Sequence, residues 1–346
     1  MRVVLACSVG NAGGAVERQV ALLARKALRD GWEPTVLAPR GSLLDALERD
    51  GVRTLPVPFR RALDLPSIAS VRRTLRRLSP HVVHAHDPRA LLAVSPVFGA
   101  LVYSDHNSST AKTAAGFFDA APWWRPIQPG LSRLLRRADL VIAASQSCLR
   151  DLRDRLHLRG RAAVVYYGAD PAPPADVHAG TIGVVSRLSP EKGVDVAVRA
   201  LGNVRGARLV VAGDGPERAR LEALAGAVGV ADRIDFLGWV DDPAPVLASA
   251  GCLCVPSRWD NAPLVVADAL LAGRPVVGAA VGGIPELIGA GDGTLVAPED
   301  PLALGRALEL VLADAGGADA RRERALARFG SGRAWSEHRR LYESVS

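Results

Sequence analysis

Long apolar runs, paired cysteines and aromatic residues are all scarce in this sequence. No apolar run approaches the roughly 20 residues that a membrane-spanning helix requires, and the N-terminus lacks the charged-then-apolar pattern of a signal peptide. The four cysteines, at positions 7, 148, 252 and 254, form no CxxC pair and no disulfide framework. We therefore expect a cytoplasmic protein whose cysteines pack as small core residues in a reducing compartment.

Aromatic residues make up only 5% of the chain, and the basic stretch "RRTLRR" contains none. Proteins that bind single-stranded nucleic acids interleave aromatic stacking platforms with basic residues. The composition therefore argues against a nucleic-acid partner.

Lysine is rare in a chain that is otherwise rich in basic residues. Of 43 lysine and arginine residues only three are lysines, namely Lys26, Lys112 and Lys192. Residues 1–170 hold 25 basic and 14 acidic residues, a net charge of +11, whereas the remainder holds 18 and 22, a net charge of −4. A basic first half suits an anionic substrate or peripheral contact with the inner face of a membrane, although arginine on solvated helix faces is the simpler explanation.

Short apolar runs alternate with amphipathic stretches along all 346 residues, which is enough chain for two domains. The predicted strands are 2–7, 34–38, 82–85, 100–103, 140–144, 163–167, 181–185, 208–212, 234–237, 252–255, 275–278 and 294–296. The predicted helices include 15–29, 67–78, 194–202, 216–228, 263–272 and 302–313. This alternation predicts an α/β protein of two Rossmann-like domains, whose parallel sheets present their carboxyl ends to a central cleft.

The proline-rich segment "GADPAPPADVHAG", residues 168–180, carries no strand or helix pattern and is interpreted as the interdomain linker. The first domain is expected to span residues 1–170 and the second residues 171–330. Residues 331–346, which include "RAWSEHRRLYESV", predict a C-terminal helix that packs back toward the first domain.

The segment "SRLSPEKG", residues 186–193, lies between a predicted strand and a predicted helix and contains the only lysine after position 112. Arg187 offers a planar fork for two oxygens, whereas Lys192 is a compact, mobile point charge. Two cations five residues apart at the carboxyl edge of a sheet suit a dianionic diphosphate. Two exposed turn residues are the alternative.

A second anion-binding element is "SRWDNAPLVVADALLAGRPVV", residues 257–277. Pro263 is expected at the first helical position, with Asp260 and Asn261 as capping candidates. The free N–H groups of this helix would then face the cleft. Strand-to-helix turns that contain glycine pairs occur at Gly13-Gly14 and at Gly282-Gly283.

The acids Asp260 and Asp268 stand eight residues apart, before and inside this predicted helix. At different heights along a nucleotide, one carboxylate suits a sugar hydroxyl and the other a ribose. A helix N-cap and an exposed helical acid are the alternatives.

Several stretches together give a family resemblance that covers nearly the whole chain. They are "GGAVERQVALLARKAL", "HVVHAHDP", "ADLVIAASQSCLRDL", "VVYYGAD", "VVSRLSPEKGVD", "VVAGDGPER", "IDFLGWVDD" and the block from 260 to 277, in that order. With them the chain resembles the retaining, nucleotide-sugar-dependent glycosyltransferases of the large bacterial family four, which have the GT-B fold. The resemblance implies sugar transfer from a nucleotide donor, with a UDP-sugar favoured, to a hydroxyl on a small-molecule, glycan or lipid-linked acceptor.

The resemblance also implies roles for individual residues. Arg187 and Lys192 would bind the donor diphosphate and stabilise its departure. Asp268 would accept hydrogen bonds from the ribose hydroxyls, and Gly14 would approach the diphosphate from the first domain. The implied donor-binding set is Gly13, Gly14, Arg187, Lys192, Trp239, Val240, Asp260, Asn261, Ala262, Pro263, Leu264 and Asp268.

The chain departs from the family where the acids are concerned. The family usually has two glutamates, whereas this chain has Asp260 and Asp268, and Asn261-Ala262-Pro263 replaces a glycine-aromatic-glycine stretch. A shorter acid arm retracts the carboxylate by roughly one bond, so the sugar or the loop must come closer. The departure bears on the identity of the donor sugar.

His106 in "YSDHNSS" matches the cleft histidine of the family. It is expected among the catalytic residues with Asp260, Arg187 and Lys192, steadying positive charge at the anomeric carbon through its carbonyl or ring. A loop histidine satisfied by its neighbours is the alternative. His84 and His86 share one face of a strand end, and together with His81 they raise a metal site as an alternative, which no carboxylate pair or cysteine completes.

Acceptor recognition is assigned to the first domain. Segment 107–130, "NSSTAKTAAGFFDAAPWWRPIQPG", is the expected selector, with Asp87, Asn107, Trp123 and Trp124 as candidate acceptor contacts. Arg72, Arg73, Arg76 and Arg77 lie on one predicted helix and suggest interfacial binding to a lipid-linked acceptor.

No enzymic nucleophile stands out, so retention would involve departure of the diphosphate on the face where the acceptor arrives. Because Arg187 and Lys192 would meet the leaving-group charge, we expect no cofactor and no divalent metal. Three other functions fit parts of the pattern: a nicotinamide-dependent dehydrogenase, whose GxGxxG fingerprint is not met, a sugar-nucleotide epimerase of the same fold, and a non-catalytic nucleotide-sugar sensor.

Overall fold

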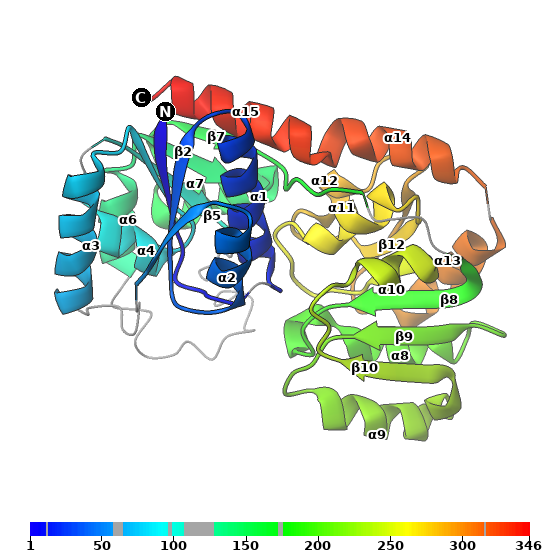
Figure 1. The fold of residues 1–346 in the computed structure, drawn as a ribbon. Helices are drawn as coiled ribbons and strands as arrows, with labels where there is room; N and C mark the ends of the chain where they lie inside the picture. Colours follow the sequence, from blue (N-terminus) through cyan, green and yellow to red (C-terminus); the bar gives the residue numbers. More distant parts are fainter. Residues whose placement is uncertain (12, 58–64, 96–98, 107–127, 172–175, 315) are drawn as a thin grey trace. The chain divides into compact units, whose positions relative to one another are not determined.

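The structure is a computed structural model that describes residues 1–11, 13–57, 65–95, 99–106, 128–171, 176–314 and 316–346. Contacts between residues divide the chain into two compact units. Unit 1 comprises Met1–Gly168 and Ser331–Ser346, and unit 2 comprises Ala169–Gly330. Figure 1 traces both units along the chain, with the C-terminal helix in red.

Unit 1 is built on a parallel sheet with the strand order β3-β2-β1-β4-β5-β6-β7. The strands are β1 (Arg2–Ala6), β2 (Glu33–Ala38), β3 (Arg53–Pro56), β4 (Val82–Ala85), β5 (Ala100–Asp105), β6 (Leu140–Ala143) and β7 (Ala162–Val164). The chain first builds outward from β1 and then resumes with β4 on its other side. Sheets of this kind bind ligands at the carboxyl ends of the two strands between which the order reverses, here β1 and β4.

The helices of unit 1 are α1 (Ala15–Arg29), α2 (Ser42–Arg49), α3 (Leu65–Leu78), α4 (Pro88–Val94), α6 (Gln128–Leu135), α7 (Gln146–Leu156) and α15 (Ser331–Glu343). The apolar run of β1 explains why two cores form. Val3 and Leu5 belong to one buried cluster, whereas Val4 and Ala6 belong to the other. Because successive side chains of a strand point to opposite faces, each face of the sheet has its own core.

Unit 2 has a parallel sheet with the strand order β10-β9-β8-β11-β12-β13. The strands are β8 (His178–Val185), β9 (Arg208–Ala212), β10 (Ile234–Gly238), β11 (Ala250–Val255), β12 (Val276–Ala279) and β13 (Gly293–Val296). The helices are α8 (Val194–Leu201), α9 (Arg218–Val228), α10 (Ala244–Ser249), α11 (Leu264–Leu271), α12 (Ile284–Leu287), α13 (Pro301–Ala313) and α14 (Ala318–Phe329), with short 3-10 turns at η2 (Pro190–Lys192) and η3 (Ala231–Arg233). The order reverses between β8 and β11, which brings the loops after these two strands together.

The prediction of two parallel α/β sheets is confirmed, and the structure has the predicted GT-B architecture of two Rossmann-like domains. One strand was missed, and the expected end of the linker was wrong. The strand β3 was not predicted, because "RTLP" lies at the sheet edge with a half-exposed, non-apolar pattern. Residues 178–180 were expected in the linker but open strand β8, where they are exposed and so lack an apolar signature.

The C-terminal helix α15 is part of unit 1. The indole Nε1 of Trp335 donates to Asp30 Oδ2 at 2.7 Å, and its ring meets Trp32 edge-on with centroids 5.2 Å apart. Tyr342 is fully buried, with its hydroxyl 2.6 Å from Nδ1 of His84. Aromatic packing and hydrogen bonds to a helix and a central strand therefore fix the end of the chain on this unit.

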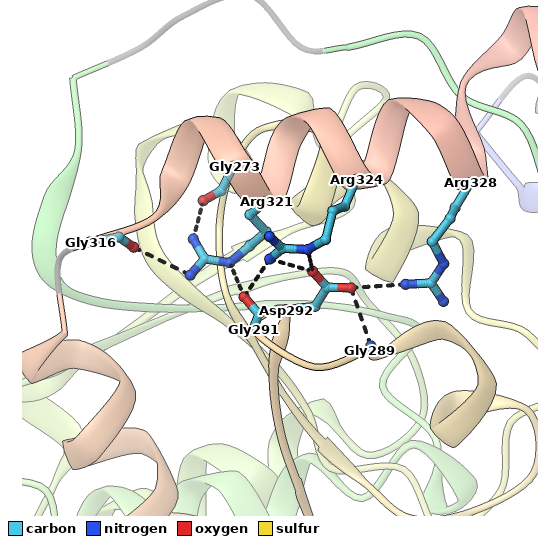
Figure 2. Close-up of polar contacts among 8 residues, drawn as sticks. All are labelled: Gly273, Gly289, Gly291, Asp292, Gly316, Arg321, Arg324 and Arg328. Carbon is cyan, nitrogen blue, oxygen red and sulfur yellow. Dashed lines mark hydrogen bonds and ion pairs between the residues drawn. The ribbon is translucent and has the colours of Figure 1, made fainter.

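The preceding helix α14 is fastened to unit 2 by a buried carboxylate. Figure 2 shows Asp292, just ahead of β13, facing three arginines of α14. Its side chain accepts hydrogen bonds from Arg324 Nε at 3.0 Å, Arg328 Nη1 at 2.8 Å and the Gly289 amide at 3.2 Å. Arg321 instead donates to the carbonyl of Gly273 at 2.8 Å. Three cations on one helix face are thus matched by one acid and by loop carbonyls.

Candidate active site

The loop after β8 carries the two predicted cations of unit 2. The Nη2 atom of Arg187 lies 2.5 Å from Glu191 Oε1, and its Nε donates to Ser189 Oγ at 3.2 Å. Although burial of Glu191 opposes ionisation, hydrogen bonds from its own amide, Arg187 and Ser189 hold the pKa of this carboxyl below its ordinary value. The acid therefore stays charged and aligns the guanidinium, while about half of the Arg187 side chain remains exposed.

Lys192 forms the second ion pair of this site. Its Nζ lies 2.5 Å from Oδ2 of Asp260, which stands 68 positions away in the loop after β11. Ser257 Oγ donates to the same oxygen at 3.4 Å. The reversal of strand order between β8 and β11 makes this contact possible, and it joins two residues for which separate roles were predicted.

Arg258 ties the loop after β11 to the segment that carries Lys192. Its guanidinium forms a two-pronged pair with Asp195 at 2.8 Å on both sides, and it donates to the carbonyl of Pro190 at 2.8 Å. Burial works against the charge of Asp195, yet the bonds from Arg258 hold its pKa below the ordinary value. Such planar bidentate pairs fix geometry as well as charge.

Two glycines let backbone segments approach this loop closely. Gly193 has φ +61°, and a Cβ there would lie 2.1 Å from the carbonyl oxygen of Pro256. Gly282 has φ +53°, and a Cβ there would lie 1.8 Å from the carbonyl oxygen of Asp260. The amide of Gly283 donates to that same carbonyl at 3.1 Å. The predicted glycine turn after β12 therefore supports Asp260 through its backbone.

The helix α11 begins one residue later than predicted. Pro263 is its N-cap rather than its first residue, and no side chain caps the helix. The alternative of Asp260 as N-cap is therefore wrong, because its carboxylate pairs with Lys192. Asp268 lies in the second turn of α11 and is buried, with 7% of its surface exposed, so it is not an exposed helical acid.

The other predicted donor-binding residues of unit 2 fall into two groups. Asn261, Ala262 and Leu264 are buried, and the side-chain nitrogen of Asn261 has no hydrogen-bond partner among the described residues. Trp239 is 59% exposed beside the half-buried Val240, and its Nε1 donates to Asp241 Oδ1 at 3.0 Å. The exposed indole stands next to the carboxyl end of β10.

The predicted glycine turn of unit 1 precedes α1, with Gly13 in the turn and Gly14 as the helix N-cap. Beside it lies a residue that the sequence did not single out. A Cβ on Gly14 would stand within 2.3 Å of Glu17 Oε2, and Glu17 is buried. Burial raises the pKa of Glu17, and the charge of Asp87 adds to the rise. A carboxyl group thus occupies the space next to Gly14.

His106 follows β5 and is half-buried among other rings of unit 1. Its Nε2 lies 2.9 Å from His86 Nδ1, and its Nδ1 lies 2.8 Å from the hydroxyl of Tyr167. Burial, with a smaller effect of His338, lowers the pKa of His106 to about 3. The ring is therefore neutral at pH 7, and each of its nitrogens already has a protein partner.

A second series of hydrogen-bonded side chains, Tyr342–His84–Ser104, lies beside the series His86–His106–Tyr167. His84 lies between Tyr342, 2.6 Å from its Nδ1, and Ser104, 2.7 Å from its Nε2, and its ring centroid lies 3.9 Å from that of His86, with the two planes tilted by 33°. His81 instead precedes β4, where its Nδ1 accepts from the Arg2 amide at 3.0 Å. The three predicted histidines therefore do not converge, and the described residues contain no cluster of three His, Cys, Asp or Glu side chains able to hold a metal.

Asp87, an expected acceptor contact, is the N-cap of α4. Its carboxylate accepts from the amides of Arg89 at 2.9 Å, Ala90 at 3.0 Å and Ser8 at 2.6 Å. The last bond joins the loops after β1 and β4 at the reversal of strand order. Its carboxylate is thus largely engaged by backbone amides.

Three expected acceptor contacts, Asn107, Trp123 and Trp124, lie outside the described residues, as does most of the expected selector segment 107–130. Of the four arginines on α3, Arg72 turns inward and donates to the carbonyl of Ser95, so the expected basic face is reduced by one. No helix among the described residues is long and apolar enough to cross a membrane.

Both halves of the chain match families of sugar-transferring enzymes. Residues 12–173 match the family described as "Glycosyltransferase Family 4", and residues 179–314 match the one described as "Glycosyl transferases group 1". The first match covers the glycine turn and His106, and the second covers all the predicted cations and acids of unit 2.

Curated relatives show the same similarity over part of their length. The chain is 34% identical over 164 residues to the D-inositol 3-phosphate glycosyltransferase of Mycobacterium marinum, which is 44% of this chain and 35% of the relative. It is 32% identical over 154 residues to the alpha-D-kanosaminyltransferase of Streptomyces kanamyceticus, which is 43% of this chain and 35% of the relative. The matches thus span about a third of each relative.

A solved structure matches the whole chain. The Anabaena protein HepE, crystallised in complex with UDP-glucose, superposes with a TM-score of 0.84 at 24% sequence identity, covering 99% of this chain and 100% of that one. This likeness concerns the fold, and it agrees with the GT-B architecture described above.

Proposed function

We propose that this protein is a glycosyltransferase that moves a sugar from a nucleoside diphosphate sugar to a hydroxyl acceptor with retention of anomeric configuration. The observation that carries the proposal is the pair of ion pairs, Arg187–Glu191 and Lys192–Asp260, at the carboxyl edge of the sheet of unit 2. Both lie in the stretch that matches group 1 glycosyl transferases. The relatives named as glycosyltransferases support the reaction class.

The two cations suit the diphosphate of the donor. Each is oriented by an acid, so the site is ordered before a ligand arrives and little rearrangement is needed. On donor binding Lys192 shares its charge between Asp260 and a phosphate oxygen, while the exposed fork of Arg187 takes two others. A UDP-sugar is the favoured donor, because HepE was solved with UDP-glucose.

Transfer then breaks the bond between the anomeric carbon and the diphosphate oxygen, whose electron pair stays with the diphosphate. The acceptor hydroxyl forms the new bond on the same face and passes its proton to the departing oxygen. Arg187 and Lys192 stabilise the growing negative charge, and Asp260 fixes the position of Lys192. Asp268 is proposed to accept hydrogen bonds from the ribose hydroxyls, and Gly14 is proposed to lie near the diphosphate.

Because the cations supply the charge, the reaction is proposed to need no divalent metal. Activity should survive EDTA, and loss of activity that manganese restores would contradict this part of the proposal. Contact of the basic first unit with a membrane is a separate proposal, based on Arg73, Arg76 and Arg77 of α3. Co-sedimentation with anionic but not neutral liposomes would support it.

The test uses UDP as the probe, in calorimetric titration of the wild type and of Arg187→Gln and Lys192→Gln variants. Because each variant removes charge-assisted hydrogen bonds, we expect its affinity for UDP to fall about 10- to 100-fold. Arg199→Gln, at the exposed far end of α8, is the matched control and should bind like the wild type. Equal affinities in all four proteins would sink the assignment.

A screen of UDP-, GDP- and dTDP-sugars for thermal protection then identifies the donor, since specific binding raises the unfolding midpoint. Slow release of sugar in the absence of acceptor would identify an enzyme rather than a sensor. Conversion of the donor sugar without transfer would identify an epimerase.

A further inference from the structure

His106 of unit 1 has an imidazole ring that is held by hydrogen bonds on both nitrogens. Both ring nitrogens are hydrogen-bonded, to His86 at 2.9 Å and to Tyr167 at 2.8 Å. The rings of both partners lie nearly parallel to it, at 18° and 17°. These partners come from two different strand ends, after β4 and after β7, so the ring is gripped from two sides.

The proton arrangement leaves no ring nitrogen free. A neutral imidazole has one N–H donor and one acceptor nitrogen. Either the Tyr167 hydroxyl donates to Nδ1 and the Nε2–H of His106 donates to His86, or every bond in the chain runs the other way. In both arrangements a substrate hydroxyl must displace a protein partner to reach the ring. A third partner on the ring is therefore unfavourable.

We propose, building on the glycosyltransferase function above, that Tyr167 and His86 are positioning residues that lock the His106 imidazole and thereby hold the main chain at the end of β5 in the geometry needed for transfer. His106 thus acts on the reacting sugar through its backbone, and its ring serves as the anchor. The three rings border a small cavity of unit 1, about 10 Å³, which admits about one water molecule.

The neighbouring hydrogen-bonded series Tyr342–His84–Ser104 offers a matched control for this proposal. Tyr342 makes the same kind of bond, from its hydroxyl to Nδ1 of His84 at 2.6 Å, and both its ring and that of His84 are fully buried. This series of hydrogen bonds ends at Ser104 and does not include His106. Tyr167→Phe and Tyr342→Phe thus each remove one buried hydroxyl–imidazole hydrogen bond, but only the first releases His106.

The experiment measures transfer or donor hydrolysis with the full-length chain and both variants. Tyr167→Phe should lower kcat about 10-fold with KM for the donor unchanged, because one hydrogen bond of about this strength holds the ring. Tyr342→Phe should keep the wild-type kcat. The proposal is overturned if both variants lose kcat equally, or if Tyr167→Phe changes KM alone or nothing.

A substitution at the other partner tests the same lock. Asparagine places a polar atom where Nδ1 of histidine stands, so His86→Asn should retain most of the wild-type kcat, whereas His86→Leu should lose about 10-fold. Equal losses in the two variants would indicate a packing role only and would refute the positioning role of His86.

An NMR measurement separates this inference from the proposed function. In the wild type, the imidazole ¹⁵N signals of His106 should report a single tautomer; Tyr167→Phe should give averaged signals, and Tyr342→Phe should change His84 but leave His106 as it was. An averaged His106 in the wild type would overturn the lock. A locked ring in a protein that neither binds nor processes any nucleotide sugar would instead overturn the proposed function.

Discussion

Mild acid should destabilise this protein steeply, because three buried histidines and the half-buried His106 are held as neutral rings. Burial lowers the pKa of His106 to about 3 and that of His338 to about 4. Burial also holds the pKa values of His84 and His86 well below the ordinary 6.5, with neighbouring histidines adding to the effect. In the unfolded chain each ring takes up a proton below pH 6.5 or so.

The sign follows from proton uptake. Below about pH 6.5 the unfolded state binds protons that the native state does not, so the free energy of unfolding falls as the pH falls. Each such histidine lowers the free energy of unfolding by about 1.4 kcal/mol for every pH unit below about 6.5, or by roughly 2 kcal/mol at pH 5. His106 and His338 together account for about 4 kcal/mol of this loss, and His84 and His86 add to it in the same direction. Since domains are stable by about 5–15 kcal/mol, a loss of at least about 4 kcal/mol is a large share of the free energy of unfolding.

The assay is urea unfolding at half-unit steps from pH 8 to pH 5. This window separates the histidines from Glu191 and Asp195, whose native pKa values lie below their ordinary values of 4.5 and 3.8, so that their contribution is lost only at lower pH. His338→Gln should reduce the slope by about 1.4 kcal/mol per pH unit. The exposed His178→Gln should leave it unchanged. A free energy of unfolding that is flat from pH 7 to pH 5 would refute the reasoning.

Two further predictions concern the framework of unit 2. Asp292→Ala removes a buried carboxylate that accepts hydrogen bonds from two arginines and an amide. The free energy of unfolding, measured by denaturant titration, should fall by about 2–3 kcal/mol. The control Glu222→Ala breaks an exposed ion pair with Arg218 and should change this free energy by less than about 1 kcal/mol. A similar loss in both variants would contradict the role given to Asp292. Gly282→Ala places a Cβ 1.8 Å from the carbonyl oxygen of Asp260 and should weaken UDP binding at least 10-fold. Gly229→Ala is the control, because Gly229 has φ +74° but open space around it, so this variant shares only the backbone strain. Unchanged UDP affinity in the Gly282 variant would show that Asp260 does not depend on this contact.

The sequence alone determined the alternating architecture of both units and the two loops that carry the cations. Mostly apolar runs such as 3–6 and 82–85 are unfavourable at a surface, so in alternation with amphipathic stretches they specify buried parallel strands. The edge strand β3 escaped prediction because an edge needs no apolar run. The cations Arg187 and Lys192 were visible because a strand-to-helix turn is a local feature.

Which side chains contact one another depends on how the strands and helices pack. Lys192 and Asp260 are 68 positions apart and His106 and Tyr167 are 61 apart, and neither pair leaves any periodic trace in the sequence. Their contacts depend on the strand order β8-β11 in one sheet and on the common carboxyl edge of β5 and β7 in the other. Hydrogen bonds act over about 3 Å, so they follow from the register and packing of whole elements, which residue types alone do not encode.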